Sequence, residues 1–249
     1  MDVALVPSPR TLDVHGGAVT WRSPLRVSVE TEWRHVVETF AGDVASSIGW
    51  DVEMVDAIAS PDVIIRRVED LRSEEYRLSI DHEVTIEAGS AAGVAYAFTV
   101  LRQLGPNELW SSATTIQSIE LPRLFIEDGP RFAWRGVHLD VARHFFDVAT
   151  VCRLIDHVAA HRLNRLHLHL NDDQGWRVEV PKWPRLAAVA STRRSSPVGH
   201  EVDGVDDGVA HAGYYSAFDL EVIRLHAERR FVTIVPEIDL PGHAQAVIA

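Results

Sequence analysis

Cysteine is almost absent from this sequence, since Cys152 is the only one among 249 residues. A single cysteine cannot form a disulfide within the chain, which excludes the small secreted scaffolds that disulfides hold together. Cys152 lies within an apolar pattern at helical spacing. This position favours a small buried hydrophobic side chain over a reactive thiol.

Long apolar stretches are absent as well. No run of residues approaches the ~18 apolar positions of a membrane-spanning helix. The first ten residues, MDVALVPSPR, have an acidic second residue and two prolines. They lack the basic segment followed by an apolar stretch that is typical of a signal peptide. We therefore expect a soluble, cytoplasmic protein without a membrane partner.

Positive charge is scarce. The chain has 24 Lys and Arg residues against 36 Asp and Glu residues, a formal net charge of −12, and Lys182 is its only lysine. Nucleic acids and anionic membranes attract clustered basic side chains, so this balance argues against a nucleic-acid partner. The hydrophobic share of 46% and the charged share of 24% are ordinary for a folded soluble protein. The length allows one or two domains.

Residues 1–128 are predicted to form an α+β domain of two layers. The β-rich segments are 19–30, 62–69, 76–81 and 83–89, of which the last two indicate a hairpin. Apolar residues at helical spacing from Trp33 to Val44 predict a helix that stops before Gly49, and a second helix is predicted over 91–104. Strands with segregated helices are typical of a two-layer domain. No residue pattern in this half indicates a functional site.

Residues 129–249 show a different pattern, in which strands and helices alternate. The predicted elements are a strand at 136–142, a helix at 147–163 capped by Asn164, a strand at 165–170, a helix from Ser216 through Arg230 and a strand at 231–239. Ser216 and Asp219 have the spacing of a capping box. This alternation predicts parallel βαβ units and an α/β fold.

Polar residues follow each of these three predicted strands. The sets are Asp140, Arg143 and His144 after the first strand, Asn171 to Trp176 after the second, and Glu237 to His243 at the end of the third. Ligands of parallel α/β sheets bind at the carboxyl ends of the strands, so we expect an active site there. In this setting Trp176 offers an aromatic surface on which a sugar ring could stack.

Several of these residues have two interpretations. His167 and His169 lie on one side of a strand and could bind a metal with His138 or His243, or could be buried histidines satisfied by hydrogen bonds. The pair Asp172 and Asp173 is either loop solvation or part of the site. Arg143 is either an ion-pair partner or a binder of hydroxyl groups. The polar stretch 191–215 is either a binding loop or a disordered insertion.

Three segments, taken in order, resemble one known family. They are RGVHLDVARHFF (135–146), NRLHLHLNDDQGWR (164–177) and PEIDLPGH (236–243), and AGSAAG (88–93) in the front half adds to them. Together they resemble the family 20 glycoside hydrolases, the β-N-acetylhexosaminidases. The resemblance implies that the front half is the small α+β domain of that family. It also implies that the back half is the first three βα units of a (β/α)8 TIM barrel, which is incomplete here.

The resemblance implies a retaining hydrolase that releases terminal N-acetylhexosamine from an oligosaccharide or glycoconjugate, with no cofactor and no metal. In this family the acetamido oxygen of the substrate attacks the anomeric carbon, and a Glu serves as general acid and base. By motif position, Arg143 would bind sugar hydroxyls. Asp172 would hold His243, which would in turn hydrogen-bond to the catalytic Glu.

The sequence departs from the family in one respect. The Gly-Gly-Asp-Glu-type motif that carries the catalytic Glu does not occur among the 249 residues. We therefore expect an amino-terminal portion of such an enzyme, truncated before the Asp-Glu motif and inactive by itself. Glu237 is interpreted as structural and not as a replacement acid. One alternative is a non-catalytic sugar-binding protein that forms an oligomer or whose barrel a partner chain completes. The other is a metal-dependent hydrolase that uses the histidine cluster.

Overall fold

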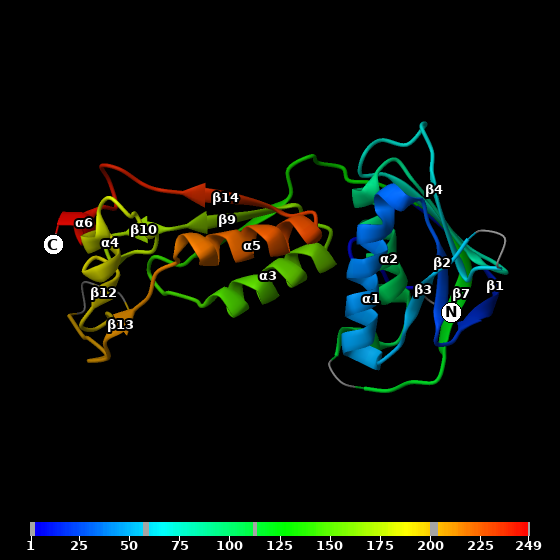
Figure 1. Ribbon diagram of the computed structural model, residues 1–249, viewed down its shortest axis with the longest axis horizontal. Coiled ribbons are helices and arrows are strands. Elements are labelled where there is room, and N and C mark those ends of the chain that lie inside the picture. Colours follow the sequence, from blue (N-terminus) through cyan, green and yellow to red (C-terminus); the bar gives the residue numbers. More distant parts are fainter. Residues whose placement is uncertain (1–2, 57–59, 112–113, 200–203, 249) are drawn as a thin grey trace. The chain divides into compact units, whose positions relative to one another are not determined.

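The computed structural model describes residues 3–56, 60–111, 114–199 and 204–248. Contacts divide the chain into two compact units, residues 1–133 and residues 134–249, which are described separately (Figure 1). Among the described residues, no helix combines the length and the apolar character needed to cross a membrane.

Unit 1 is built on a mixed sheet of seven strands. These are β1 (Thr11–Trp21), β2 (Leu25–Ser28), β3 (Val52–Met54), β4 (Val63–Arg67), β5 (Tyr76–Ile80), β6 (Val84–Ala88) and β7 (Ile119–Asp128). Their order across the sheet is β1-β7-β5-β6-β4-β2-β3. The predicted hairpin is confirmed, since β5 and β6 pair in antiparallel fashion with Ser79 opposite Thr85.

The predicted strand 19–30 is in fact two strands with different partners. β1 pairs with β7 at one edge of the sheet, whereas β2 pairs with β3 and β4 near the other edge. Pro24 lies between them and has no N–H to donate to a ladder, which explains why the extended segment does not continue through it.

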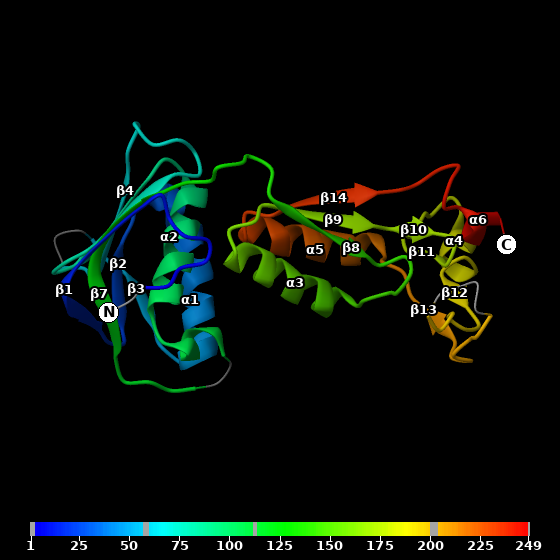
Figure 2. The ribbon, with the colours of Figure 1, turned by 180° about the vertical axis from the view of Figure 1, so that it is seen from behind.

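Two helices cover one face of this sheet, as Figures 1 and 2 show from opposite sides. They are α1 (Arg34–Ile48), preceded by the 3-10 turn η1 (Thr31–Trp33), and α2 (Ala91–Leu104), followed by η3 (Asn107–Trp110). Helix α1 ends at Gly49, whose φ of 71° is left-handed and favours glycine. Helix α2 begins at Ser90, whose side chain accepts a hydrogen bond from the Ala92 N–H. Both predicted helices are confirmed.

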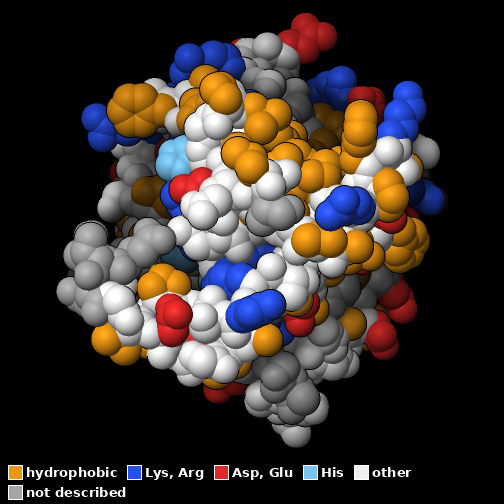
Figure 3. All heavy atoms as spheres, turned by 90° about the vertical axis from the view of Figure 1, so that its left-hand side faces the viewer, with side chains coloured by type: hydrophobic (Ala, Val, Ile, Leu, Met, Phe, Trp, Pro, Cys, Tyr) orange, Lys and Arg blue, Asp and Glu red, His pale blue; other side chains and the backbone are white. Residues whose placement is uncertain are grey.

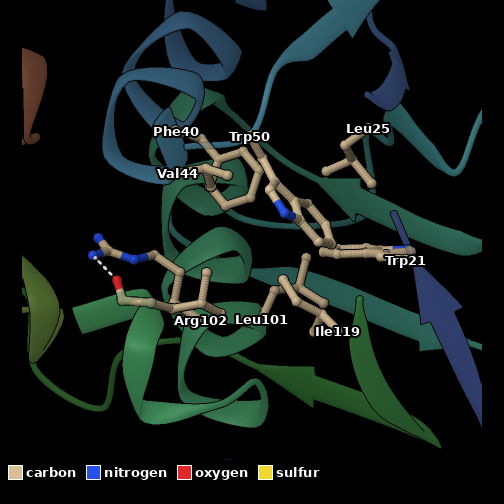
Figure 4. Close-up of a pocket in the computed structure, with 9 residues that line it drawn as sticks. Trp21, Leu25, Phe40, Val44, Trp50, Leu101, Arg102 and Ile119 are labelled. Atoms are coloured by element: carbon tan, nitrogen blue, oxygen red, sulfur yellow. Dashed lines mark hydrogen bonds between the residues drawn. The ribbon is translucent and has the colours of Figure 1, made fainter. Parts of the chain in front are cut away.

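The core of unit 1 lies between the helices and the sheet. The rings of Phe40 and Phe98 stack with their centroids 4.1 Å apart. A small pocket nearby is lined largely by aliphatic and aromatic side chains, including Trp21 and Trp50 (Figure 4). At its rim Arg102 donates a hydrogen bond to the Leu109 carbonyl at 2.8 Å. The lining marks this pocket as part of the hydrophobic core.

Unit 2 contains a sheet of three parallel strands with two long helices. Its elements are β8 (Gly136–Asp140), α3 (Val148–Ala160), β9 (Arg165–His169), β10 (Asn171–Asp172), β11 (Gly175–Trp176), α4 (Pro184–Ala188), β12 (Thr192–Arg193), β13 (His211–Ala212), α5 (Ala217–Arg229), β14 (Thr233–Glu237) and α6 (Gln245–Ile248). The order is β14-β9-β8, and both pairings are parallel. The predicted α/β pattern is confirmed, and the described residues form no closed barrel.

The two faces of the β8–β9–β14 sheet have different chemistry. Leu166 and Leu168 are fully buried in a cluster with residues of α3 and α5. Because side chains alternate along a strand, His167 and His169 point to the opposite face. One face therefore carries the hydrophobic core of unit 2, and the other carries ionisable side chains.

Some boundaries in unit 2 differ from those expected. Helix α3 ends at Ala160, and Arg162 has a left-handed φ of 57°. The prediction that Asn164 caps this helix is wrong, because its side chain accepts a hydrogen bond from the Arg135 N–H instead. Cys152 is only partly buried. The predicted capping box is confirmed, with reciprocal hydrogen bonds between Ser216 and Asp219.

The polar stretch 191–215 includes residues 200–203, which lie outside the described residues. On either side of them, strands β12 and β13 pair with Arg193 opposite His211. The Asp207 carboxylate accepts hydrogen bonds from the Ser196 N–H at 2.8 Å and the Val209 N–H at 2.9 Å. The described part of this stretch is thus held by its own hydrogen bonds.

Candidate active site

The three parallel strands of unit 2 end together. Asp140 of β8 and Glu237 of β14 both lie opposite His169 of β9 in the register of the sheet. Figure 3 views the molecule from this end, where basic side chains lie near the centre of the face and hydrophobic side chains gather above them. The predicted meeting of the three polar segments at one edge is therefore observed.

Asp172 lies at the centre of this edge, and its side chain is only 1% exposed. One of its oxygens, Oδ2, contacts His169 Nε2 at 2.9 Å, His243 Nδ1 at 2.9 Å and an Arg143 terminal nitrogen at 2.5 Å. The other oxygen accepts the Asp173 N–H at 2.6 Å. The short hairpin of β10 and β11 holds Asp172 at this position.

The environment of Asp172 keeps it ionised. Burial disfavours its charge, but its hydrogen bonds, led by that from His169, outweigh burial and hold the pKa of Asp172 below its usual value. Burial also opposes charge on His169. The carboxylates of Asp172 and Glu237 outweigh that effect and raise the pKa of His169.

Arg143 is fixed by acidic neighbours while remaining accessible. Its guanidinium donates to Asp140 at 2.7 Å, and its Nε donates to Gln174 at 3.3 Å. The second carboxylate oxygen of Asp140 accepts the N–H groups of Ala142 and Arg143, which shapes the turn that follows β8. Burial would lower the pKa of Arg143, but Asp140 and Asp172 together raise it. With 45% of the side chain exposed, the planar donor group can still bind hydroxyls.

His243 lies in a loop whose backbone is fixed by hydrogen bonds to the Asn171 side chain. The Asn171 side chain donates to the carbonyls of Asp239 and His243 and accepts the Asp239 N–H at 2.7 Å. His243 itself has a left-handed φ of 52°. With Nδ1 on Asp172 and 51% of the side chain exposed, its Nε2 is on the side of the ring away from the carboxylate and can hydrogen-bond to a further group.

Glu237 lies opposite His169 on the polar face of the β8–β9–β14 sheet, among three histidines. Its Oε2 is 2.8 Å from His169 Nδ1, 2.8 Å from His167 Nε2 and 3.7 Å from His138 Nε2. The pKa of Glu237 lies below its usual value, chiefly because of the contact with His169. Within the part of the chain that the structure describes, two groups of side chains offer ligand atoms within 4.8 Å of one another. These are His138, His169 and Glu237, and Asp172, Asp173 and His243.

Arg177 holds together the loops around the site. It is fully buried, and its guanidinium donates to four backbone carbonyls, those of Val141, Ala142, Ser191 and Gly213. Burial lowers the pKa of Arg177 to about 10. Because Val141 and Ala142 directly precede Arg143, Arg177 fixes the backbone that presents Arg143. This contact also explains why β8 ends at Asp140 and not at the predicted Ala142.

Trp176 does not have the expected role. Its side chain belongs to a buried cluster with Ala190 and Ala246, and its indole nitrogen donates to the Val178 carbonyl. The residue is only 6% exposed. The prediction that Trp176 offers a stacking surface to a sugar is therefore wrong, because its ring is buried against Ala190 and Ala246.

A cavity of about 400 Å³ adjoins Arg143. His144, Arg193 and His211 are among its lining residues. His211 Nε2 accepts the Phe145 N–H at 2.8 Å, which requires the unprotonated nitrogen. Burial and then the nearby Arg193 lower the pKa of His211 to about 4. The cavity is therefore an open polar space beside the Arg143 guanidinium.

Comparison with known proteins identifies the family. The family description "Glycosyl hydrolase family 20, domain 2" matches residues 2–129. The description "Glycosyl hydrolase family 20, catalytic domain" matches residues 132–249. The chain belongs to glycosyl hydrolase family 20.

The relatives of this family-20 chain are longer proteins. A β-N-acetylhexosaminidase of Cellulomonas fimi is 36% identical, and the match covers 98% of this chain and 47% of the relative. A β-hexosaminidase of Vibrio furnissii is 30% identical over 99% of this chain and 39% of the relative. The solved structure of Streptomyces plicatus N-acetyl-β-hexosaminidase has a TM-score of 0.85 at 34% identity and covers 98% of this chain and 47% of its own. The chain thus spans about half the length of these relatives, or less.

The structure brings together all three site residues expected from the sequence. Arg143 and His243 both contact Asp172. Sequence reasoning gave no role to Arg177. It interpreted His169 as either a metal ligand or a buried histidine satisfied by hydrogen bonds, and in the structure His169 is buried and hydrogen-bonds to Asp172. The sequence around Arg177 is polar and does not indicate that this side chain is buried. Only the folded chain therefore shows which groups Arg177 binds.

Proposed function

We propose that this family-20 chain is part of a β-N-acetylhexosaminidase that releases terminal N-acetylhexosamine from oligosaccharides or glycoconjugates. The observation that carries the proposal is the shared contact of Arg143, His169 and His243 with the buried Asp172 carboxylate. The names of the relatives support it, as does a structure of the Streptomyces plicatus enzyme that contains GlcNAc as product.

In the proposed reaction the substrate's acetamido oxygen attacks the anomeric carbon, as is general for this family. Arg143 binds sugar hydroxyls through its exposed donors. Asp172 fixes the orientation of His243, since its ionised oxygen lies 2.9 Å from Nδ1. His243 then hydrogen-bonds through Nε2 to the carboxyl group of the general acid. This contact holds the acid in the protonated form that the reaction needs.

The remaining parts of the proposal concern the barrel and the acid. We take β8, β9 and β14 as the first three strands of a (β/α)8 barrel, because they are parallel and lie side by side in chain order. The catalytic Glu is proposed to lie outside these 249 residues. Loss of a general acid lowers rates by roughly 10²- to 10⁴-fold, so the 249-residue chain alone should be inactive or nearly so.

Hydrolysis of a chromogenic N-acetyl-β-glucosaminide tests the proposal. A longer protein that contains this chain and a Gly-Gly-Asp-Glu-type motif should hydrolyse it, and its Arg143→Ala variant should show a raised KM. An Arg185→Ala variant is the matched control, because Arg185 is exposed on α4. Failure of the longer protein to release the chromophore would refute the proposed activity. Comparable turnover by the 249-residue chain would refute the placement of the acid.

A second candidate is a sugar-binding protein that does not hydrolyse its ligand, or one whose barrel a partner chain completes. The three-stranded sheet favours it, since β8 and β14 each pair on one side only among the described residues and open strand edges promote association. Size-exclusion chromatography with light scattering separates these cases. A stable monomer would contradict the need for a partner.

A further inference from the structure

The polar stretch 191–215 has contacts to which the proposed reaction gives no role. Its strands β12 and β13 pair with Arg193 opposite His211. Arg193 donates through Nη2 to the Arg143 carbonyl at 2.8 Å. His211 accepts the Phe145 N–H through Nε2, also at 2.8 Å. Two paired side chains of one hairpin therefore hold two nearby peptide groups of the loop that carries Arg143.

The loop between β8 and α3 depends on such contacts. Strand β8 ends at Asp140 and α3 begins at Val148, and residues 141–147 between them form neither helix nor strand. A segment without a regular backbone ladder is held in place only by the groups that contact it. Hydrogen bonds weaken steeply when the donor is displaced or misaligned. Arg143 can therefore bind sugar hydroxyls well only if its backbone is fixed from outside the loop.

Arg193 also fixes the partner of the Arg143 head group. Its Nη1 donates to the Gln174 carbonyl at 3.3 Å, and the Gln174 side chain accepts the Arg143 Nε–H at 3.3 Å. The rigid fork of donors in a guanidinium suits such a double contact. One side chain thus binds the backbone of Arg143 and the backbone of the residue that orients the Arg143 guanidinium.

Arg193 is itself held by neighbouring residues of the same stretch. Its Nε and Nη2 donate to Ser196 Oγ at 3.0 Å and 2.8 Å, and the Ser196 N–H donates to the Asp207 carboxylate at 2.8 Å. At the other strand, a Cβ in place of the Gly213 hydrogen would collide with the Phe145 ring. Glycine at this position therefore permits the hairpin to lie directly against the loop.

We propose that the β12–β13 hairpin, through Arg193 and His211, positions Arg143 for binding the terminal sugar. Both are positioning residues, since they act on the backbone and on the partner of Arg143. This role rests on the proposed function, in which Arg143 binds sugar hydroxyls. The contacts that carry it are all made between described residues of unit 2. The stretch 191–215 is then a support for the binding residue.

Steady-state hydrolysis of a chromogenic N-acetyl-β-glucosaminide by a longer protein that contains this chain and a Gly-Gly-Asp-Glu-type motif tests the proposal. Arg193→Ala should raise KM about 5-fold, the factor expected for one weakened hydrogen bond to the substrate, and should change kcat by less than about 2-fold. His211→Ala should raise KM as well. His211→Gln should restore it, because the Gln side-chain carbonyl can accept the Phe145 N–H. Arg194→Ala is the matched control, since Arg194 is the next residue and is exposed.

A double-mutant cycle separates positioning from direct contact with the sugar, because Arg193 also lines the cavity beside Arg143. In the Arg143→Ala background, Arg193→Ala should leave KM unchanged, since no guanidinium remains to be positioned. A further rise in KM in that background would show that Arg193 binds the substrate itself and would overturn the proposal. An unaltered KM in the Arg193→Ala single variant would overturn it as well.

Amide hydrogen exchange of the same proteins gives a readout that does not depend on hydrolysis. Exchange of the Phe145 N–H should be at least about 10-fold faster in His211→Ala and slow again in His211→Gln. Slow exchange of the α3 amides is the check that unit 2 of each variant is folded. Absence of hydrolysis by the unaltered longer protein would refute the proposed function, whereas equal Phe145 exchange in all variants would refute the contact by which the hairpin holds the loop.

Discussion

The two units of this chain differ in the charged side chains that they bury. In unit 1 the buried side chains are almost all apolar, and Glu75 and Asp128 are the buried acids among its described residues. In unit 2 the buried set includes Arg177, Asp172 and His169, all near the carboxyl ends of the strands. Burying a charge is costly unless it is paired and hydrogen-bonded. Unit 1 is therefore built for stability, whereas unit 2 maintains a fixed charged site.

The largest effect is expected at Arg177. Its replacement by Met removes a donor from each of the four carbonyls that it binds, of which the Ser191 carbonyl keeps the Gly213 N–H. Each buried carbonyl left without a donor costs about 1–3 kcal/mol. Because some carbonyls will find water, we expect a loss of about 3–5 kcal/mol in the unfolding free energy of unit 2. Urea denaturation measures it, with Arg185→Met on the exposed surface of α4 as control. A loss no larger than the control's would contradict the role of Arg177.

The next effect is expected at Asp172. Asp172→Asn keeps the shape of the side chain but removes the charge that holds Arg143, His169 and His243. We expect about 2–4 kcal/mol of destabilisation, because breaking a buried ion pair leaves its partners uncompensated. Asp173→Asn, one residue along and exposed, provides the comparison. Equal denaturation midpoints for the two variants would show that the Asp172 charge is not what stabilises this edge.

Unit 1 offers a smaller electrostatic effect that depends on pH. The Glu75 carboxylate accepts hydrogen bonds from the Arg72 side chain and backbone and from Arg10. The first of these chiefly lowers the pKa of Glu75 from 4.5 to about 2. A folded pKa below the unfolded one means that the stabilisation is present above about pH 4.5 and is lost as the pH falls towards 2.

The test compares the unaltered chain with Glu75→Gln. At neutral pH the variant should be less stable by about 1–2 kcal/mol, a value reduced by solvent screening of the exposed Arg72. The difference should shrink between pH 4.5 and pH 2, as followed by urea denaturation of unit 1. A difference that is constant over this range would mean that the lost interaction does not depend on the Glu75 charge.

The smallest effect is expected at the helix caps, where the two units should behave alike. Ser90 caps α2 in unit 1, and Ser216 caps α5 in unit 2, where the Ser216 N–H also donates a hydrogen bond to the Asp219 carboxylate. Replacement by Ala should cost about 1 kcal/mol in each case. Thermal denaturation of the two variants measures this. A much larger effect in unit 2 would indicate that the α5 cap is coupled to the charged site.

Local patterns in the sequence were sufficient for most of the regular structure. Helix α2 has its predicted bounds, and the β5–β6 hairpin and the capping box at Ser216 are observed. These features depend on neighbours within a few residues, so their signals are contained in short segments. The sequence did not reveal that 19–30 divides between distant parts of the sheet, because strand partners are chosen by residues far away in the chain.

The site residues likewise divide into those that the sequence predicted and those that only the structure revealed. Position after a strand predicted that Arg143, Asp172 and His243 would meet, since the carboxyl ends of parallel strands share one edge. By itself the sequence determined the family, the order of elements and the residues available for chemistry. Only the tertiary structure decided that Trp176 is buried, that Arg177 binds four carbonyls and that three imidazoles surround Glu237. Burial and the pairing of charges depend on which segments pack together, and no local pattern in the chain records that.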